Sequence, residues 1–147
     1  MLKDTMKATG RLNIVVKDAS GQVKDTREVD NLVVTAGLNF IAARMGAGTA
    51  DVMSHMGIGT GTTAAAAGDT DVGTALGSRV SLDSATVSTN TIQYVGTFTS
   101  LTGAVTEAGV FNAATSGTML CRTVFSAVNI ASADTLTITW TVTISAS

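Results

Sequence analysis

The end of the chain has the most regular alternation of apolar and polar positions. Between residues 134 and 145 threonine occupies every second position, and large apolar residues occupy the positions between. Successive side chains of a strand point to opposite faces, so this pattern predicts a strand over 135–145. The expected core side consists of Leu136, Ile138, Trp140, Val142 and Ile144. The expected polar side consists of Thr135, Thr137, Thr139, Thr141 and Thr143.

Shorter alternations predict further strands along the rest of the chain. Segments 11–17 and 23–29 flank a Ser-Gly turn and predict a β-hairpin whose charged second arm is either solvated or an edge strand. Further strands are expected near 52–58, 80–82, 86–88, 92–98, 105–111 and 119–125. The rest of the Gly-, Ala- and Thr-rich segment 46–77 is expected to be a long loop.

One segment has helical rather than strand spacing. Apolar residues at Leu38, Ile41 and Met45 recur at the period of a helix, which we expect over 36–45. Thr35 is placed to cap its start, and Gly46 is placed to end it.

These elements together define the expected fold class. Many strands, a single helix and no βαβ rhythm predict a mostly β protein, an antiparallel β-sandwich of jelly-roll-like type with one short α-helix. The 147 residues form a single domain of ordinary size, with residues 1–10 as an extended N-terminal arm.

The charges are few and uneven. Charged residues make up 14% of the chain, against about 25% in an average soluble domain, and more than half of them lie within the first thirty positions. The neutral remainder suggests a surface covered by copies of the chain or by a partner. A net charge of −2 gives no basic footprint for nucleic acid, and no apolar run reaches the roughly 18 residues of a membrane-spanning helix. We therefore expect neither nucleic acid nor a membrane as a partner.

Isolated reactive residues give little support for an enzyme. Cys121 and His55 are the only residues of their kinds, and Cys121 falls in an expected strand, where a cysteine usually behaves as a small apolar residue. The GIGTG stretch at 57–61 resembles a phosphate-binding loop but lacks the lysine and the following helix. Asp69 and Asp71 begin like a calcium loop, but Val80 stands where the bidentate glutamate is required.

Glu107 and Arg122 form the remaining candidate pair. If the chain turns near residues 114–115, the two residues face each other on adjacent antiparallel strands and form an ion pair. The same register places Val110 opposite Met119. We therefore expect no catalytic site, cofactor or metal. A hydrolase would have to use Asp69, Asp71 and Asp83, the only clustered acids, all near turns.

Two stretches resemble segments of structural proteins of tailed bacteriophages. NLVVTAGLNFIAARM at 31–45 resembles their N-L-V-T-N-A-G-L opening, and VTEAGVFNAATSGTMLCRTVF at 105–125 resembles their E-I-G-L-F-D-A-x-x-G-x-L segment. The second match rests on Glu107, Gly109, Phe111, Asn112, Ala113, Gly117 and Leu120. Asn112 replaces the aspartate of tail-type motifs, and the repeats of a complete fibre are missing.

The resemblance implies a structural part of a virion. That class contains capsid decoration (cement) proteins as well as tail-fibre and baseplate proteins, and the small single domain favours decoration. It implies synthesis in the cytoplasm of a host bacterium, a place on the phage head surface, the major capsid protein as partner, and a homo-oligomer, taken as a trimer. The alternative is a tail-associated adaptor or a receptor-binding tip that recognises a glycan. We expect the threonine stripe 135–143 to contact a partner; the alternative is a solvated face.

Overall fold

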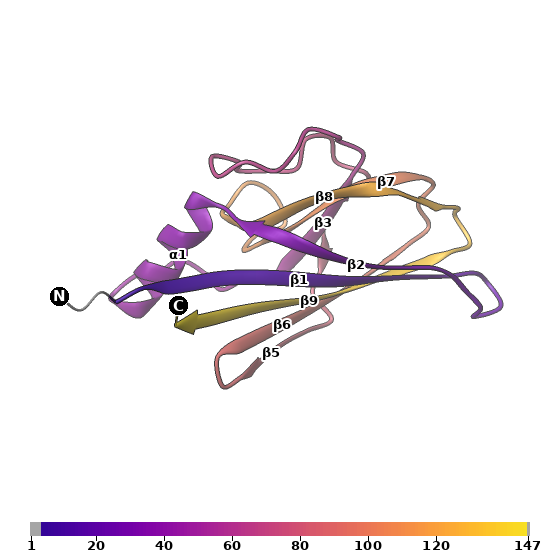
Figure 1. The fold of residues 1–147 in the computed structure, drawn as a ribbon. Coiled ribbons are helices and arrows are strands. Elements are labelled where there is room, and N and C mark those ends of the chain that lie inside the picture. The colour runs from indigo at the N-terminus through magenta and orange to yellow at the C-terminus, as the bar shows by residue number, and fades with distance from the viewer. Residues whose placement is uncertain (1–3, 147) are drawn as a thin grey trace.

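The computed structural model describes residues 4–146, in which nine strands and one helix occur (Figure 1). The elements in chain order are β1 (Met6–Lys17), β2 (Val23–Val33), α1 (Thr35–Met45), β3 (His55–Gly59), β4 (Val80–Ser81), β5 (Ser84–Ser88), β6 (Thr91–Thr99), β7 (Gly103–Phe111), β8 (Met119–Ile130) and β9 (Thr135–Ala146). The mostly β class, the single helix and the approximate positions of the strands are as expected from the sequence.

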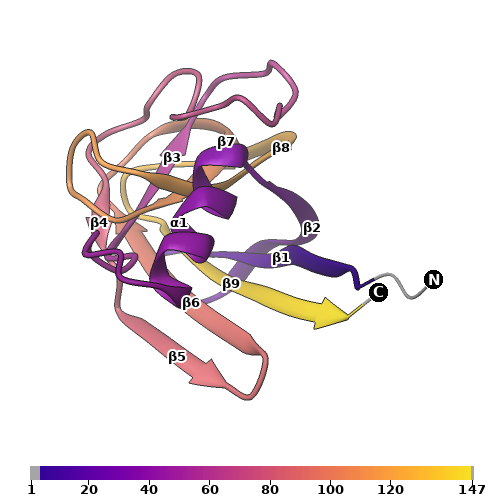
Figure 2. The ribbon, with the colours of Figure 1, turned by 90° about the vertical axis from the view of Figure 1, so that its left-hand side faces the viewer.

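All nine strands belong to one antiparallel sheet, with the order β4-β3-β7-β8-β2-β1-β9-β6-β5. The sheet curls into a half-barrel, which is seen from one end in Figure 2. Its two wings meet at β2, which pairs with β1 along most of its length but with β8 only through Leu32 and Val33. The expected division into a jelly-roll-like sandwich is not evident in this arrangement.

The core lies on the inner, concave face of the sheet. Leu136, Ile138 and Trp140 of β9 are fully buried there, as their alternation predicted, whereas Ile144 near the end of the strand is only partly buried. Trp140 lies between Leu12 of β1 and Tyr94 of β6 in the two ladders. Burial of each such side chain stabilises the fold by about 1.5–3 kcal/mol.

The N-terminal hairpin extends further than its sequence pattern predicted. β1 pairs with β9 from Met6 onward, so residues 6–10 belong to the sheet and the expected arm over 1–10 is wrong for them; residues 1–3 lie outside the described chain. β2 is an inner strand of the sheet rather than an edge strand, although its charged residues Lys24, Glu28 and Asp30 are exposed.

The helix α1 lies at the end of the half-barrel, surrounded by strands of both wings (Figure 2). It begins at Thr35, one residue earlier than expected, and Val34 precedes it, so Thr35 does not cap it. Gly37 is the buried residue of the helix. A Cβ at this position would collide with the backbone of Leu120, so glycine allows the helix to approach β8 this closely. Leu38 and Met45, two of the apolar residues whose spacing predicted the helix, are 48% and 76% exposed.

The segment between β3 and β4 runs without a strand or helix across the outer face of β7 and β8. One isolated bridge, Gly59 to Ala75, fixes its course beside β3. In the described part of the chain, no helix has both the length and the apolar character needed to cross a membrane.

Candidate functional site

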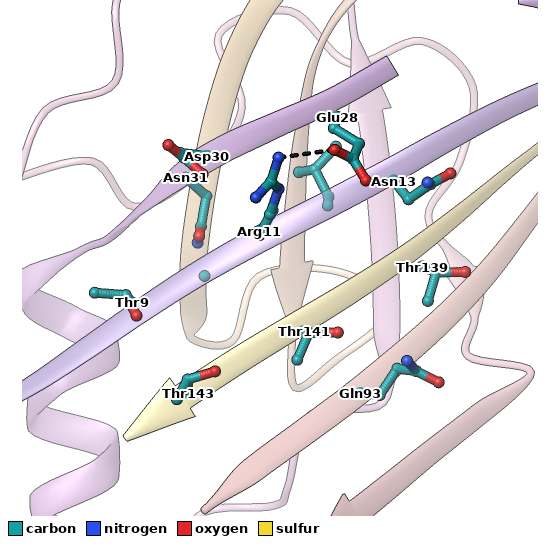
Figure 3. Close-up of a pocket in the computed structure, with 12 residues that line it drawn as sticks. Thr9, Arg11, Asn13, Glu28, Asp30, Asn31, Gln93, Thr139, Thr141 and Thr143 are labelled. Atoms are coloured by element: carbon teal, nitrogen blue, oxygen red, sulfur yellow. Dashed lines mark hydrogen bonds and ion pairs between the residues drawn. The ribbon is translucent and has the colours of Figure 1, made fainter. Parts of the chain in front are cut away.

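The threonine stripe of β9 lies on the outer face of the curled sheet. β9 is flanked by β1 and β6, and β2 lies beyond β1. The polar side chains of these four strands form one surface, which we call the outer polar face (Figure 3). This face is hollowed into a groove of about 710 Å³. The polar side chains that line the groove are those of Thr9, Arg11, Asn13, Glu28, Asp30, Gln93, Thr139, Thr141 and Thr143, whereas the side-chain atoms of Asn31, which also borders the groove, are buried against Gly10.

The strand registers explain why these side chains lie together. Arg11 of β1 stands opposite Thr141 of β9, and Thr141 stands opposite Gln93 of β6 on its other side. Residues directly opposite in an antiparallel ladder point to the same face. All five threonines of the stripe, 135 to 143, are partly exposed, so their hydroxyl and methyl groups are accessible to a partner.

Charge on the outer polar face is confined to the side nearest β2. Arg11 donates to Glu28 at 2.7 Å, with side chains 63% and 60% exposed, and Asp30 stands opposite Arg11 in the ladder. An ion pair this exposed contributes about 0–1 kcal/mol to stability. The part of the face formed by β9 and β6 carries no charged side chain; its side chains are those of threonines and Gln93, together with the partly exposed Val95 opposite Thr139.

A second polar cluster lies on the outer face of the other wing, beneath the segment 60–75. Glu107 of β7 and Arg122 of β8 form the expected ion pair, with 2.9 Å between Arg122 Nη2 and Glu107 Oε1. Their side chains are 0% and 3% exposed. The carboxylate also accepts hydrogen bonds from the backbone N–H groups of Gly61, Gly73 and Thr74, at 2.5, 2.6 and 2.9 Å.

Arg122 connects the same segment to β8. Its Nη1 donates to Asp69 at 2.7 Å, and its Nη2 donates to the carbonyl oxygen of Thr63 at 3.0 Å. The two buried charges therefore hold the covering segment 60–75 at several points. Neither charge is left unpaired, which is the condition under which burial of an ion pair is tolerated.

The register predicted for this pair is wrong, although the pair forms. Arg122 stands opposite Gly109, and Val110 stands opposite Cys121 rather than opposite Met119. Two irregularities in the β7–β8 ladder, one on each side of the segment 107–110 and both with the extra residues on β8, shift the pairing. The long arginine side chain reaches Glu107 diagonally along the same face.

The network lowers the pKa of both carboxyl groups. Burial by itself would raise the pKa of Glu107, but hydrogen bonds from backbone N–H groups and from Arg122 outweigh burial, so its pKa lies below the usual value. The pKa of Asp69 is also lowered, first by the backbone N–H of Ala66 and then by Arg122. Both groups are charged near neutral pH.

The glycine-rich stretch 57–61 has a structural explanation that the sequence alone did not give. It leads into the backbone that surrounds Glu107, and a Cβ on Gly59 or Gly61 would collide with that carboxylate. Glycine thus lets the chain approach closely enough to donate its N–H groups to an anion. The resemblance to a phosphate-binding loop reflects binding of an anion, but the anion is a side chain of the same protein.

The structure does not bring the other candidate residues together. His55 and Cys121 lie on strands separated by β7 and on opposite faces of the sheet, because Cys121 aligns with Val110 and Met56 across the ladders. Asp83 binds the hydroxyl of Thr97 at 2.6 Å, remote from Asp69 in the sheet order. Within residues 4–146, no three His, Cys, Asp or Glu side chains are grouped so that they could hold a metal ion.

The remaining residues of the 105–125 stretch shape the turn between β7 and β8. Asn112 accepts a hydrogen bond from the N–H of Thr118 at 2.7 Å and donates to the carbonyl oxygen of Asp51 at 3.1 Å. Gly117 has a φ of 69°, which favours glycine. Phe111 is buried beneath the guanidinium of Arg79, 3.4 Å from its ring centre. Each of these residues has a structural role.

Comparison of the chain with protein-family profiles, with curated proteins and with solved structures finds no match.

Proposed function

We propose that the protein is a structural component of a bacteriophage particle, a decoration protein that binds the assembled head and stabilises it. The observation that carries the proposal is the outer polar face, a broad accessible surface on which β9 presents threonine at five successive outward positions. The likeness of segments 31–45 and 105–125 to phage structural proteins supports the same proposal.

The chemistry of this surface suits a contact between proteins. Threonine offers both a methyl group and a hydroxyl group, and it has no charge that must lose its water on association. A strand face that only meets solvent would be expected to carry Lys and Glu as well. Across the ladders Thr139 stands between Asn13 and Val95, and Thr141 stands between Arg11 and Gln93.

In this proposal the partners are the major capsid protein and further copies of the chain, arranged as a trimer on the head surface. The half-barrel takes the place of the jelly-roll-like sandwich expected from the sequence and serves as the rigid body. Binding only to the assembled shell stabilises that shell, as any ligand stabilises the state that it prefers. No catalytic group takes part.

The double variant Thr139→Lys/Thr141→Lys tests the proposal. It should keep the fold, because both side chains are partly exposed, but it should lose binding to heads prepared without the protein. Thr115→Lys, at an exposed position in the turn between β7 and β8, is the matched control and should bind as the unsubstituted protein does. Unchanged head binding by the double variant would overturn the role of the threonine face and favour a solvated face.

The alternative within the same class is a tail-associated adaptor or receptor-binding tip. Quantitative mass spectrometry of purified particles separates the two positions. A copy number comparable to that of the major capsid protein supports decoration of the head, whereas a few copies per particle support the tail. Labelling the protein in intact particles gives the same distinction by position.

A further inference from the structure

The sheet ends in two edge strands of different kinds. At one end β4 spans only Val80–Ser81, and so short an edge offers little backbone to another chain. At the other end β5 spans Ser84–Ser88, its five residues are all exposed, and in the described part of the chain it pairs with β6 alone. One side of β5 therefore presents backbone N–H and C=O groups to solvent.

The β5 edge lacks the features that usually keep an edge from pairing. Natural edge strands are protected by lysine or other charged residues, by proline or by bulges. β5 contains no charged residue and no proline, and its ladder with β6 is regular. No charged residue occurs between Asp83 and Glu107. The carboxylate of Asp83 accepts a hydrogen bond from the Thr97 hydroxyl of its own chain at 2.6 Å.

An exposed apolar hollow adjoins this edge. It measures about 470 Å³, and its apolar lining consists of Val87, Ile92, Val142 and Ile144. Val87 is 72% exposed although it stands opposite Ile92, whose neighbours along the inner face belong to the core. The inner apolar face thus continues to the β5 edge, where the described part of the chain leaves Val87 exposed.

We propose that the β5 edge is a self-association site, at which β5 of a second copy pairs antiparallel with it about a two-fold axis. Overlap of all five residues places Thr86 opposite Thr86 of the second copy and Val87 opposite Ala85 of the second copy. Pairing of β5 with β5 of a second copy is isologous, so the backbone N–H and C=O groups of each edge find partners on the other edge by symmetry. Because β5 is uncharged, two copies meet without repulsion between like charges.

Each copy also extends the apolar surface of the other. The strand of the second copy lies beside Val87 and continues the inner face past the hollow. This contact uses the end of the sheet, whereas the threonine face lies on β9, with β6 between them. The two surfaces can therefore be altered separately, and the edge contact does not depend on the proposed role in a phage particle.

Disulfide trapping with Thr86→Cys tests the proposed register. The Cα atoms of directly opposed residues in an antiparallel ladder lie about 4.5–5.5 Å apart, within the range that a disulfide spans. Native Cys121 is fully buried, so the introduced thiol is the accessible one. Thr115→Cys, exposed in a turn on the other wing, is the matched control for random collision. Thermal melting checks that both variants fold.

The expected result is a covalent dimer that forms at least about tenfold faster for Thr86→Cys than for Thr115→Cys, because pairing raises the effective concentration of the two thiols. Adding Val87→Lys to Thr86→Cys should reduce its rate to that of the control. Val23→Lys is the same change at a 55% exposed position in the N-terminal hairpin. Added to Thr86→Cys, it should leave the rate of dimer formation high.

Either of two results would overturn the proposal. Equal rates for Thr86→Cys and Thr115→Cys would show that the edge does not pair with itself. A fast rate that persists in Thr86→Cys/Val87→Lys would show that the apolar hollow takes no part. Thr139→Lys/Thr141→Lys added to Thr86→Cys should leave the rate unchanged, so that failure of the threonine-face proposal is read separately through head binding.

Discussion

The outward, polar sides of the strands are exposed on one wing of the curled sheet and covered on the other. On the wing centred on β9 the outward side chains, the threonines of β9 as well as the ion pair of Arg11 and Glu28, remain accessible. On the wing of β7 and β8 the outward side chains include Glu107 and Arg122, and the segment 60–75 covers them completely. The same strand alternation thus produced one open face and one closed face.

The difference between the wings follows from the cost of burying charge. A buried carboxylate requires hydrogen bonds and an opposite charge, and Glu107 obtains three backbone N–H groups as well as Arg122. Because these N–H groups belong to the segment 60–75, the hydrogen bonds hold that segment against β7 of the same chain. Threonine makes no such demand, so its face is left for solvent or for another molecule. The buried charges of one wing hold its covering segment in place, whereas the charges and hydroxyl groups of the other wing stay exposed.

The largest expected effect comes from removing the buried carboxylate. Glu107→Ala leaves Arg122 buried without its fully buried partner, and we expect a loss of about 3–5 kcal/mol in the free energy of unfolding. Urea denaturation measures this loss. Replacing both residues by methionine should recover part of it, because no buried charge then lacks a partner. A loss below about 1 kcal/mol for Glu107→Ala would show that the closed wing does not depend on its ion pair.

Acid should weaken the closed wing before the open one. The pKa of Glu107 lies below its ordinary value of 4.5 in the folded state, so the folded protein binds fewer protons than the unfolded chain as the pH falls below that value. The stability due to this group is complete above about pH 4.5 and is lost as the pH decreases toward the folded-state pKa. Asp69 acts in the same direction, from its ordinary value of 3.8.

Hydrogen exchange at the backbone amides of Gly61 and Gly73, followed from pH 6 to pH 3, measures this acid effect after correction for intrinsic rates. Glu107→Gln provides the control, since it cannot titrate and should show a flatter dependence. Equal acid responses in the two proteins would contradict the assignment to Glu107.

A smaller loss of stability is expected from a substitution where the segment 60–75 approaches the carboxylate of Glu107. Gly61→Ala introduces a methyl group that collides with Glu107, and we expect a loss of about 1–3 kcal/mol from overpacking. Gly68→Ala is the matched control in the same segment, because a Cβ there meets no atom within 4 Å. Thermal melting of the two variants gives the comparison. Equal melting temperatures would show that the segment shifts without loss.

The smallest effect is expected on the open wing. Arg11→Ala removes the exposed ion pair with Glu28 and should change the free energy of unfolding by about 0.2–1 kcal/mol. A loss comparable to that of Glu107→Ala would contradict the contrast between the wings. The measurement is the same urea titration, repeated at high salt, where the difference from the unsubstituted protein should shrink further.

The sequence by itself determined the strands, the single helix and the identity of the core. Alternation has a period of two residues and is a local property, so Leu136, Ile138 and Trp140 were assigned to the core without knowledge of any contact. The Glu107–Arg122 pair was also within reach, because a turn between two strands brings their charged residues near each other.

Only the tertiary structure decided the register, the curl of the sheet and the covering of one face. The irregularities of the β7–β8 ladder leave no signal in the apolar pattern, yet the one next to Phe111 places Cys121 opposite Val110. Likewise, the glycines near residue 60 have no periodicity that points to Glu107, because the contact joins segments 46 residues apart. Local patterns fix which face a side chain occupies, but the segment that covers that face is chosen by the long-range packing of the whole chain.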